Sequence, residues 1–161
     1  MNYESLLSAL VKSGLRFVIV GGVAMNLQGS ALNTNDLDIV YARDPETIAG
    51  LIRTLSRFSP RLRTAGGRVS FRFDDRTIKH GMNFTLETSV GNIDLLGEIA
   101  GIGKYDGALK LSKPVKLGKN TVRVLSLAGL IKTKRASGRP KDKVALVELE
   151  ALEELERETH A

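Results

Sequence analysis

The spacing of hydrophobic residues predicts alternating helices and strands in the first part of the chain. Residues 3–13 place apolar side chains every three to four positions, which is the helical period. Phe17–Val20 is an unbroken apolar run rich in β-branched residues, as in a strand buried on both faces. A short helix is expected over residues 23–28, and the polar–apolar alternation of Asp36–Tyr41 predicts a second strand.

Hydrophobic and turn-forming residues predict the remaining elements in the same way. Pro45 suits the first turn of a helix, and Ser126 suits the capping position of another. We expect helices over 45–58, 126–137 and 141–156, strands over 69–73, 83–88, 92–99, 115–117 and 122–125, a basic loop over 61–67, and an irregular segment over 100–111.

This order of elements predicts an α/β (α+β) fold, in which a small mixed β-sheet is flanked by helices. The sequence contains neither a regular βαβ alternation nor internal repeats. We expect a single domain, with a core over residues 1–125 and a C-terminal helical pair over 126–161 that packs on this core.

Composition excludes several classes of protein. Of the 161 residues, 42% are apolar, which is enough for a core, and the absence of cysteine excludes disulfides and thiolate metal sites. The longest apolar stretch, residues 17–25, is far shorter than the roughly 20 residues of a membrane-spanning helix. The N-terminus lacks the basic and apolar blocks of a signal peptide. We therefore expect a soluble, cytoplasmic protein.

The net charge of +6 is unevenly distributed along the chain. Arginines are concentrated within 53–76 and a second basic group lies within 132–143, whereas 148–158 is strongly acidic. Basic clusters attract polyanions such as nucleic acid or triphosphates, although exposed arginines also serve simply to keep a protein soluble.

Asp36 and Asp38 are the first candidates for chemistry. In a strand their side chains point to the same side, about 6.5–7 Å apart, while Leu37 faces the core. Two carboxylates at that distance repel each other by roughly 2–3 kcal/mol at an effective dielectric near 20, unless a proton or a cation intervenes. Oxygen ligands without histidine or cysteine suit Mg²⁺ or Mn²⁺. The alternative is that one aspartate caps a turn and the other is merely exposed.

A glycine pair and a later aspartate complete the candidate set. Gly21 and Gly22 join a buried strand to a helix, where bare backbone N–H groups bind an anion or where a tight turn needs positive φ. Asp94 alternates with apolar residues in a later strand, where a lone aspartate costs free energy unless it is paired or metal-bound. We expect it to be the third carboxylate, with Glu87 and Glu98 as fallbacks.

Together these motifs resemble those of a known enzyme family. The strand–Gly21-Gly22–helix unit, followed by Gly29-Ser30 and by Thr34-x-Asp36-Leu37-Asp38, is similar to the nucleotidyltransferase fold shared by polymerase β-like enzymes. Segment 81–96 resembles the part that supplies the third carboxylate, and segment 130–142 is similar to the C-terminal helices of small bacterial members. Those members include the toxins of abortive-infection (type IV) toxin–antitoxin pairs.

The resemblance implies an enzyme that uses two Mg²⁺ (or Mn²⁺) ions to move a nucleoside monophosphate from ATP or another NTP to a hydroxyl. The acceptor would be RNA (such as tRNA), a protein or a small molecule, and the toxin members would have an antitoxin partner. In many relatives an arginine stands two residues before Thr34, where this chain has Leu32. The resemblance assigns catalysis and metal binding to Asp36, Asp38 and Asp94, and nucleotide binding to Gly21, Gly22, Ser30, Thr34, Lys134 and Arg139.

Two other interpretations stay open. A non-catalytic member of the same fold would bind nucleotide, RNA or another protein; Leu32 mildly favours this, whereas the intact aspartate set disfavours it. A phosphohydrolase of a different fold would normally combine its aspartates with histidines, and the central region offers only His80.

Overall fold

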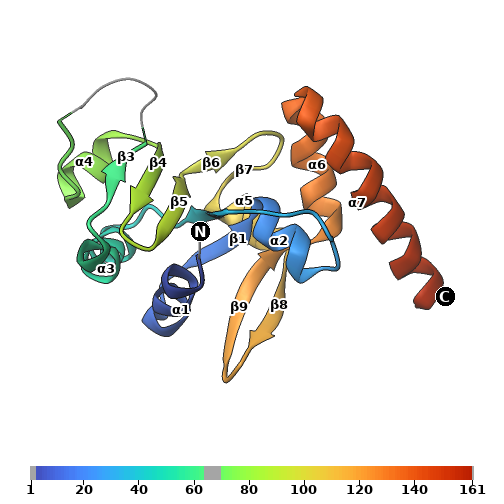
Figure 1. Cartoon of the computed structure of the whole chain (residues 1–161), viewed down its shortest axis with the longest axis horizontal. Coiled ribbons are helices and arrows are strands. Elements are labelled where there is room, and N and C mark those ends of the chain that lie inside the picture. The colour runs from blue at the N-terminus through green and yellow to red at the C-terminus, as the bar shows by residue number, and fades with distance from the viewer. Residues whose placement is uncertain (1–2, 64–69, 161) are drawn as a thin grey trace.

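The computed structural model of the protein describes residues 3–63 and 70–160 (Figure 1). The strands are β1 (Phe17–Val20), β2 (Asp36–Tyr41), β3 (Arg61–Leu62), β4 (Asn83–Thr88), β5 (Gly91–Leu96), β6 (Glu98–Ile99), β7 (Gly103–Lys104), β8 (Ser112–Leu117) and β9 (Asn120–Leu125). The helices are α1 (Glu4–Ser13), α2 (Gly21–Leu27), α3 (Pro45–Leu55), α4 (Asp75–His80), α5 (Tyr105–Lys110), α6 (Leu127–Ser137) and α7 (Pro140–Thr159), and η1 (Ser56–Phe58) is a 3-10 turn.

Seven of the strands form one mixed sheet in the order β3-β4-β5-β2-β1-β9-β8. β1 runs parallel to β9 and β2 runs parallel to β5, while the other neighbouring strands are antiparallel. β6 and β7 form a separate two-stranded ribbon. The prediction of a mixed sheet flanked by helices is therefore confirmed.

The side chains of β2 point alternately to two faces of the sheet, with apolar residues on one face and Asp36 and Asp38 on the other. Ile19 of β1 pairs with Ile39 of β2, and both are fully buried, as is Leu37. Burying each such side chain stabilises the fold by about 1.5–3 kcal/mol. Because side chains alternate along a strand, Asp36 and Asp38 lie on the opposite face from this core.

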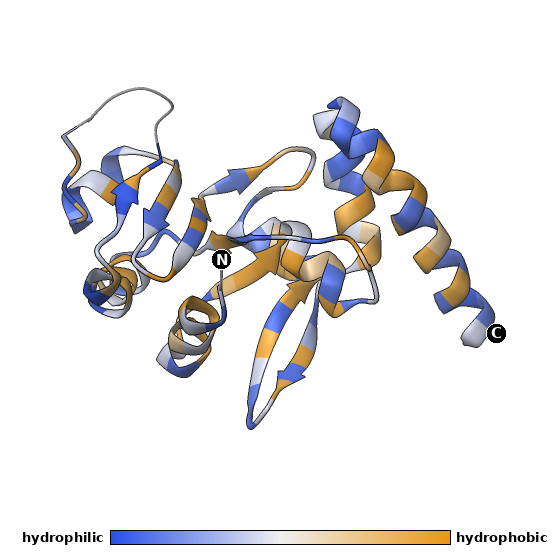
Figure 2. Cartoon of the chain, in the orientation of Figure 1, coloured by the Kyte–Doolittle hydropathy of each residue, from blue (hydrophilic) through white to orange (hydrophobic). Residues whose placement is uncertain are grey.

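The predicted C-terminal helical pair is present. α6 and α7 lie side by side at the end of the molecule that is opposite α4 and β3 (Figure 1). Ser126 caps α6 by accepting a hydrogen bond from the Gly129 N–H at 3.1 Å. Along α7, hydrophobic and hydrophilic residues alternate in bands (Figure 2), with Leu149 buried and Leu155 exposed. Within the described ranges, no helix combines the length and apolar character needed to span a membrane.

The segment between α3 and β4 differs most from the predictions. Arg61 and Leu62 were expected in a loop but form β3 along the edge of β4, and residues 64–67 lie outside the described ranges. Residues 70–73 form no strand, although a strand was expected over 69–73, of which Val69 is not described. β3 pairs with β4 at Leu86 and Glu87 and is itself the outermost strand of the sheet. Instead the chain forms α4, capped by Asp74.

Three further segments differ from the predictions, two of them at glycines. Residues 100–111 were expected to be irregular, but they contain β7 and α5; positive φ at Gly101 and Gly103 permits the tight turn between β6 and β7. The strand expected over 92–99 is broken at Gly97 into β5 and β6. The helix expected over 45–58 is α-helical only as far as Leu55 and ends in η1.

Candidate active site

The structure brings Asp36, Asp38 and Asp94 together on one face of the sheet. β2 and β5 run parallel, and their register places Asp38 beside Asp94 and Asp36 beside Asn92. Laterally paired residues on neighbouring strands point to the same face, and such strands lie about 4.8 Å apart. Alternation along each strand turns these side chains away from their apolar neighbours. The register between β2 and β5 then places Asp38 next to Asp94 and Asp36 next to Asn92.

The Gly21–Gly22 turn packs against this group of carboxylates. Val20, the last residue of β1, pairs with Asp38. Gly21 has a φ of 65°, and a Cβ at this position would overlap Oδ2 of Asp38. A Cβ on Gly22 would lie 2.5 Å from Oγ1 of Thr34. Both glycines are thus required because side chains of the candidate site occupy the space that a Cβ would need.

Arg63 provides a positive charge directly opposite two of the carboxylates. Its Nη2 donates to Oδ1 of Asp94 at 2.7 Å and to the carbonyl of Leu86 at 2.9 Å. Its Nη1 donates to Oδ2 of Asp36 at 3.3 Å. The amide of Asn92 donates to the other oxygen of Asp36 at 3.2 Å. The guanidinium therefore bridges β2 and β5, and it leaves Asp38 without a direct contact.

Asp38 is electrostatically distinct from its two neighbours. Burial, followed by the charge and hydrogen bonding of Asp94, raises its pKa to about 7. The nearby ammonium group of Lys134 opposes this rise in the pKa. Oδ1 of Asp38 is buried and has no hydrogen-bond partner among the described residues. A buried carboxylate oxygen without a partner is costly, which favours either a retained proton or a bound cation.

Two hydroxyl residues predicted to bind nucleotide occupy different positions. Oγ1 of Thr34 donates to the backbone carbonyl of Asp36 at 3.3 Å, and this side chain packs on Gly22 beside the carboxylates. Ser30 is buried, and its hydroxyl accepts a hydrogen bond from the Leu32 N–H at 3.1 Å. The Ser30 hydroxyl therefore already stabilises the turn, and its role in binding nucleotide stays a prediction.

Lys134 and Arg139, the predicted basic contacts, share one buried partner. Nζ of Lys134 lies 3.2 Å from Oδ1 of Asp142, and Nε of Arg139 lies 2.8 Å from Oδ2. The Asp142 side chain is fully buried, whereas those of Lys134 and Arg139 are 19% and 56% exposed. Burial opposes ionisation of Asp142, but hydrogen bonds from Arg139, Ser137 and Lys134 hold its pKa well below the usual range. Asp142 thus joins α6 to α7.

The donor set suits a hard divalent cation by residue type. Across residues 3–63 and 70–160, no group of three or more His, Cys, Asp or Glu side chains is already arranged to hold a metal ion. Arg63 pairs with one oxygen of Asp36 and one oxygen of Asp94. Three carboxylates with one unpartnered buried oxygen on Asp38 match the oxygen ligands that Mg²⁺ and Mn²⁺ prefer. By residue type these side chains suit such an ion, while Arg63 holds one oxygen of Asp36 and one of Asp94.

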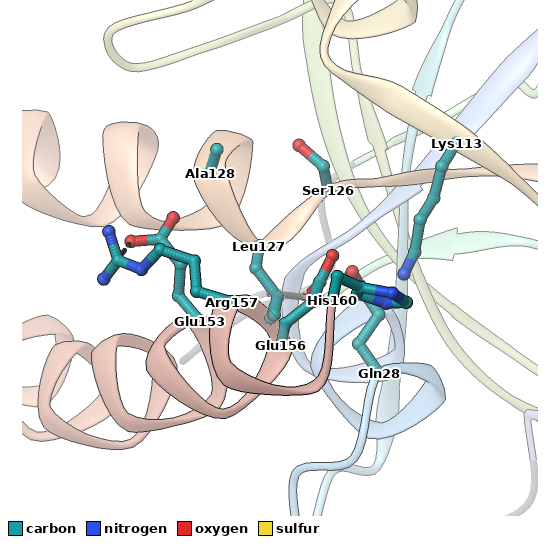
Figure 3. A pocket seen from close by; sticks show the side chains of 9 residues that line it. All are labelled: Gln28, Lys113, Ser126, Leu127, Ala128, Glu153, Glu156, Arg157 and His160. Carbon is teal, nitrogen blue, oxygen red and sulfur yellow. Dashed lines mark ion pairs between the residues drawn. The ribbon is translucent and has the colours of Figure 1, made fainter.

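A separate cavity of about 270 Å³ lies between the start of α6 and the end of α7 (Figure 3). The side chains of Gln28, Lys113 and His160 converge at one side of it, and Leu127 lines its apolar part. None of the aspartates or glycines of the candidate site lines this cavity. It is therefore distinct from the carboxylate group.

Comparisons with known proteins show a likeness only at the level of structure. No protein-family model matches the chain, and no curated protein sequence matches it. Among solved structures, the chain is similar to a crystal structure from Thermotoga maritima described as a "putative nucleotidyltransferase", at 19% sequence identity and a TM-score of 0.48. The match covers 99% of this chain and 96% of that chain. An activity for this chain has to be argued from its own site.

Sequence reasoning did not single out Arg63 or Asp142 for a role. Arg63 is one of many arginines in its segment, and only the strand order β3-β4-β5-β2 carries its side chain to the carboxylates. Asp142 reads as an ordinary polar residue near the start of a helix. Asn92 was detectable, because alternation places it on the same side as Asp94. The fallback Glu87 instead pairs with Arg61 at 3.0 Å.

Proposed function

We propose that this protein is a divalent-metal-dependent nucleotidyltransferase, which transfers a nucleoside monophosphate from an NTP to a hydroxyl acceptor and releases pyrophosphate. The observation that carries the proposal is the pairing of Asp38 with Asp94 on the face against which the Gly21–Gly22 turn packs. Gathering like charges around a side-chain-free turn destabilises a fold, and such arrangements concentrate at functional sites. The motif resemblance to polymerase β-like enzymes supports the same activity.

The three aspartates have complementary roles in this proposal. Asp36 and Asp38 would hold two Mg²⁺ or Mn²⁺ ions, and Asp94 would share the second. Bound divalent ions neutralise charge on the phosphates and activate the attacking hydroxyl. Asp94, which lies beside Asp38, would accept the proton of that hydroxyl. Gly21 and Gly22 would leave the backbone open to the phosphates.

Lys134 is the proposed phosphate-contacting cation. It lies close enough to Asp38 to oppose the rise in that residue's pKa, and Asp142 holds its ammonium group at 3.2 Å. A lysine in this position would stabilise charge on the transferred phosphate. Arg139 is proposed as a secondary contact, since the same Asp142 orients it.

We propose RNA, such as tRNA, as the acceptor. The net charge of +6 favours binding of a polyanion. Lys132, Lys141 and Lys143 are exposed on α6 and α7, and no ion pair to them is found in the described part of the chain. A toxin role with an antitoxin partner is the finer form of this proposal; it predicts that expression arrests growth and that Asp38→Asn relieves the arrest.

The activity is tested by incubating the protein with each α-³²P-labelled NTP, total RNA and total protein, with Mg²⁺, Mn²⁺ or EDTA. We expect label in the RNA fraction only with a divalent ion. Asp38→Asn should reduce incorporation by about 10³-fold or more, since it removes a metal ligand. Asp106→Asn is the matched control, because Asp106 is an exposed aspartate on α5.

The outcomes separate the candidate functions. Label in protein would retain the activity and change the acceptor. Metal-dependent NTP binding without any transfer would favour a non-catalytic nucleotide-binding member. If the protein shows no transfer and also no metal-dependent NTP binding, the proposed function is contradicted.

A further inference from the structure

Arg63 occupies the position between Asp36 and Asp94, where positive charge compensates both carboxylates. It directly follows β3, and its backbone N–H donates to the Thr85 carbonyl of β4 at 2.9 Å, which anchors the residue. From there the side chain passes over β4 to reach β5 and β2, with contacts of 2.7 Å to Asp94 and 3.3 Å to Asp36. Its side chain is 28% exposed, so solvent screens these contacts only in part.

We infer that Arg63 is an internal counter-cation that competes with a divalent metal ion for the oxygens of Asp36 and Asp94. The inference rests on the proposed function, because it concerns the same carboxylates. The two terminal nitrogens of the Arg63 guanidinium donate charge-assisted hydrogen bonds to two different carboxylates, one to Asp36 and one to Asp94, which the single ammonium group of a lysine is less suited to do. An ion that coordinates Asp36 and Asp94 needs oxygens to which Arg63 already donates.

The contacts of Arg63 with Asp36 and Asp94 compensate only part of the negative charge of the three aspartates. Arg63 satisfies one oxygen of each of its two partners but does not contact Oδ1 of Asp38, which is buried and has no partner within residues 3–63 and 70–160. Nε of Arg63 is itself buried without an acceptor among the described residues. A cation placed among all three carboxylates would satisfy Asp38 as well, and the displaced guanidinium would regain partners in water. We therefore expect a divalent metal ion to displace the Arg63 guanidinium from Asp36 and Asp94.

Lys134 does not perform this function. Its ammonium group is paired with the buried Asp142, on the side of α6 and α7. Arg61, two residues before Arg63, is 76% exposed and pairs with Glu87 rather than with an aspartate of the site. Arg61 is therefore a matched control, because its substitution changes charge two residues away without removing the contacts of Arg63 to Asp36 and Asp94.

The test is Mn²⁺ affinity in the absence of nucleotide, measured from the EPR signal of free Mn²⁺ during titration. Arg63→Gln removes charge and bridge, and it should bind Mn²⁺ about tenfold or more tightly than the unchanged protein. Arg63→Lys keeps the charge but loses the two-donor fork, and it should bind about threefold or more tightly. Arg61→Gln removes a charge but keeps the bridge, and it should stay within about twofold. Thermal unfolding with EDTA verifies that each variant is folded.

Each outcome distinguishes this inference from the proposed function. Tighter binding in both Arg63 variants, with Arg61→Gln unchanged, supports competition. If only Arg63→Gln binds Mn²⁺ more tightly, the effect is one of charge alone, and the inference that the two hydrogen bonds of Arg63 compete with the metal ion is overturned. Equal or weaker binding in both Arg63 variants would overturn the inference while keeping the metal site. No Mn²⁺ binding to the unchanged protein or to Arg63→Gln would overturn the inference and the metal-dependent function together.

Discussion

Asp142, which is buried, and Asp38, which is half-buried, have opposite electrostatic environments. Asp142, between α6 and α7, faces Lys134 and Arg139, and its pKa is held well below the usual range. Asp38, on β2, faces Asp94 on the neighbouring strand, and burial raises its pKa to about 7. One carboxylate is surrounded by donors, and the other retains a buried oxygen with no partner among the described residues.

From this difference we expect Asp142 to stabilise the fold and Asp38 to destabilise it. Asp142 links two helices through charge-assisted hydrogen bonds, so its removal leaves cations unpaired. The environment of Asp38 disfavours its charged form, because the carboxylate is partly desolvated and lies near like charges, so we expect it to lower stability when ionised. An uncompensated carboxylate that persists in a buried position is the kind of group found where a ligand completes the site.

The largest expected effect is that of Asp142→Ala. Losing the shared partner of Lys134 and Arg139 should lower the free energy of unfolding by about 3 kcal/mol, and Tm by about 6–12 °C. The control is Glu150→Ala, which breaks an exposed α6–α7 ion pair with Arg135 and should cost under about 1 kcal/mol. Because the folded-state pKa of Asp142 is lowered, its contribution is present above its ordinary value of 3.8 and disappears as the pH falls further. Equal losses in the two variants would contradict the comparison.

A smaller effect of opposite sign is expected for Asp38→Asn in EDTA. At pH 8 this variant should be more stable by about 2 kcal/mol, with Tm raised by about 4–8 °C, because it removes a desolvated charge. The raised folded-state pKa places the change between 3.8 and about 7: the variant's advantage is absent at pH 4 and complete above pH 7. Thermal unfolding across this range measures it. A variant that is less stable at pH 8 would show that Asp38 is structural.

The smallest expected effect is the difference between alanine variants of two glycines with similar backbone angles, only one of which lies against Asp38. Gly14 and Gly21 have φ values of 69° and 65°, but only a Cβ on Gly21 would meet Asp38. Each alanine variant should lose about 1 kcal/mol from backbone strain, and Gly21→Ala should lose about 1–2 kcal/mol more from the overlap. Chemical denaturation measures both. In an Asp38→Ala background, Gly21→Ala should lose no more unfolding free energy than Gly14→Ala. If Gly21→Ala still loses about 1–2 kcal/mol more, the overlap with Asp38 is not the cause.

The candidate site could be predicted from sequence in part, because each aspartate signals its orientation locally. Alternation with Leu37 and with Ile93 is visible without any structure, and it places Asp36, Asp38 and Asp94 off the hydrophobic face. The assignment of catalytic and metal-binding roles to these residues stays a prediction. Arg63 gave no signal, since nothing local distinguishes an arginine that reaches over a neighbouring strand from one in solvent.

Sequence by itself determined which segments are helices and strands wherever hydrophobic period, caps and turns agree, as in β1, β2, α6 and α7. It failed over residues 70–73, because whether an alternating segment forms a strand depends on its tertiary context. Tertiary structure alone decided that Asp38 stands beside Asp94, that Arg63 bridges Asp36 and Asp94, and that Asp142 pairs with Lys134. These contacts depend on strand order, register and helix packing, which arise from interactions between residues far apart in the chain.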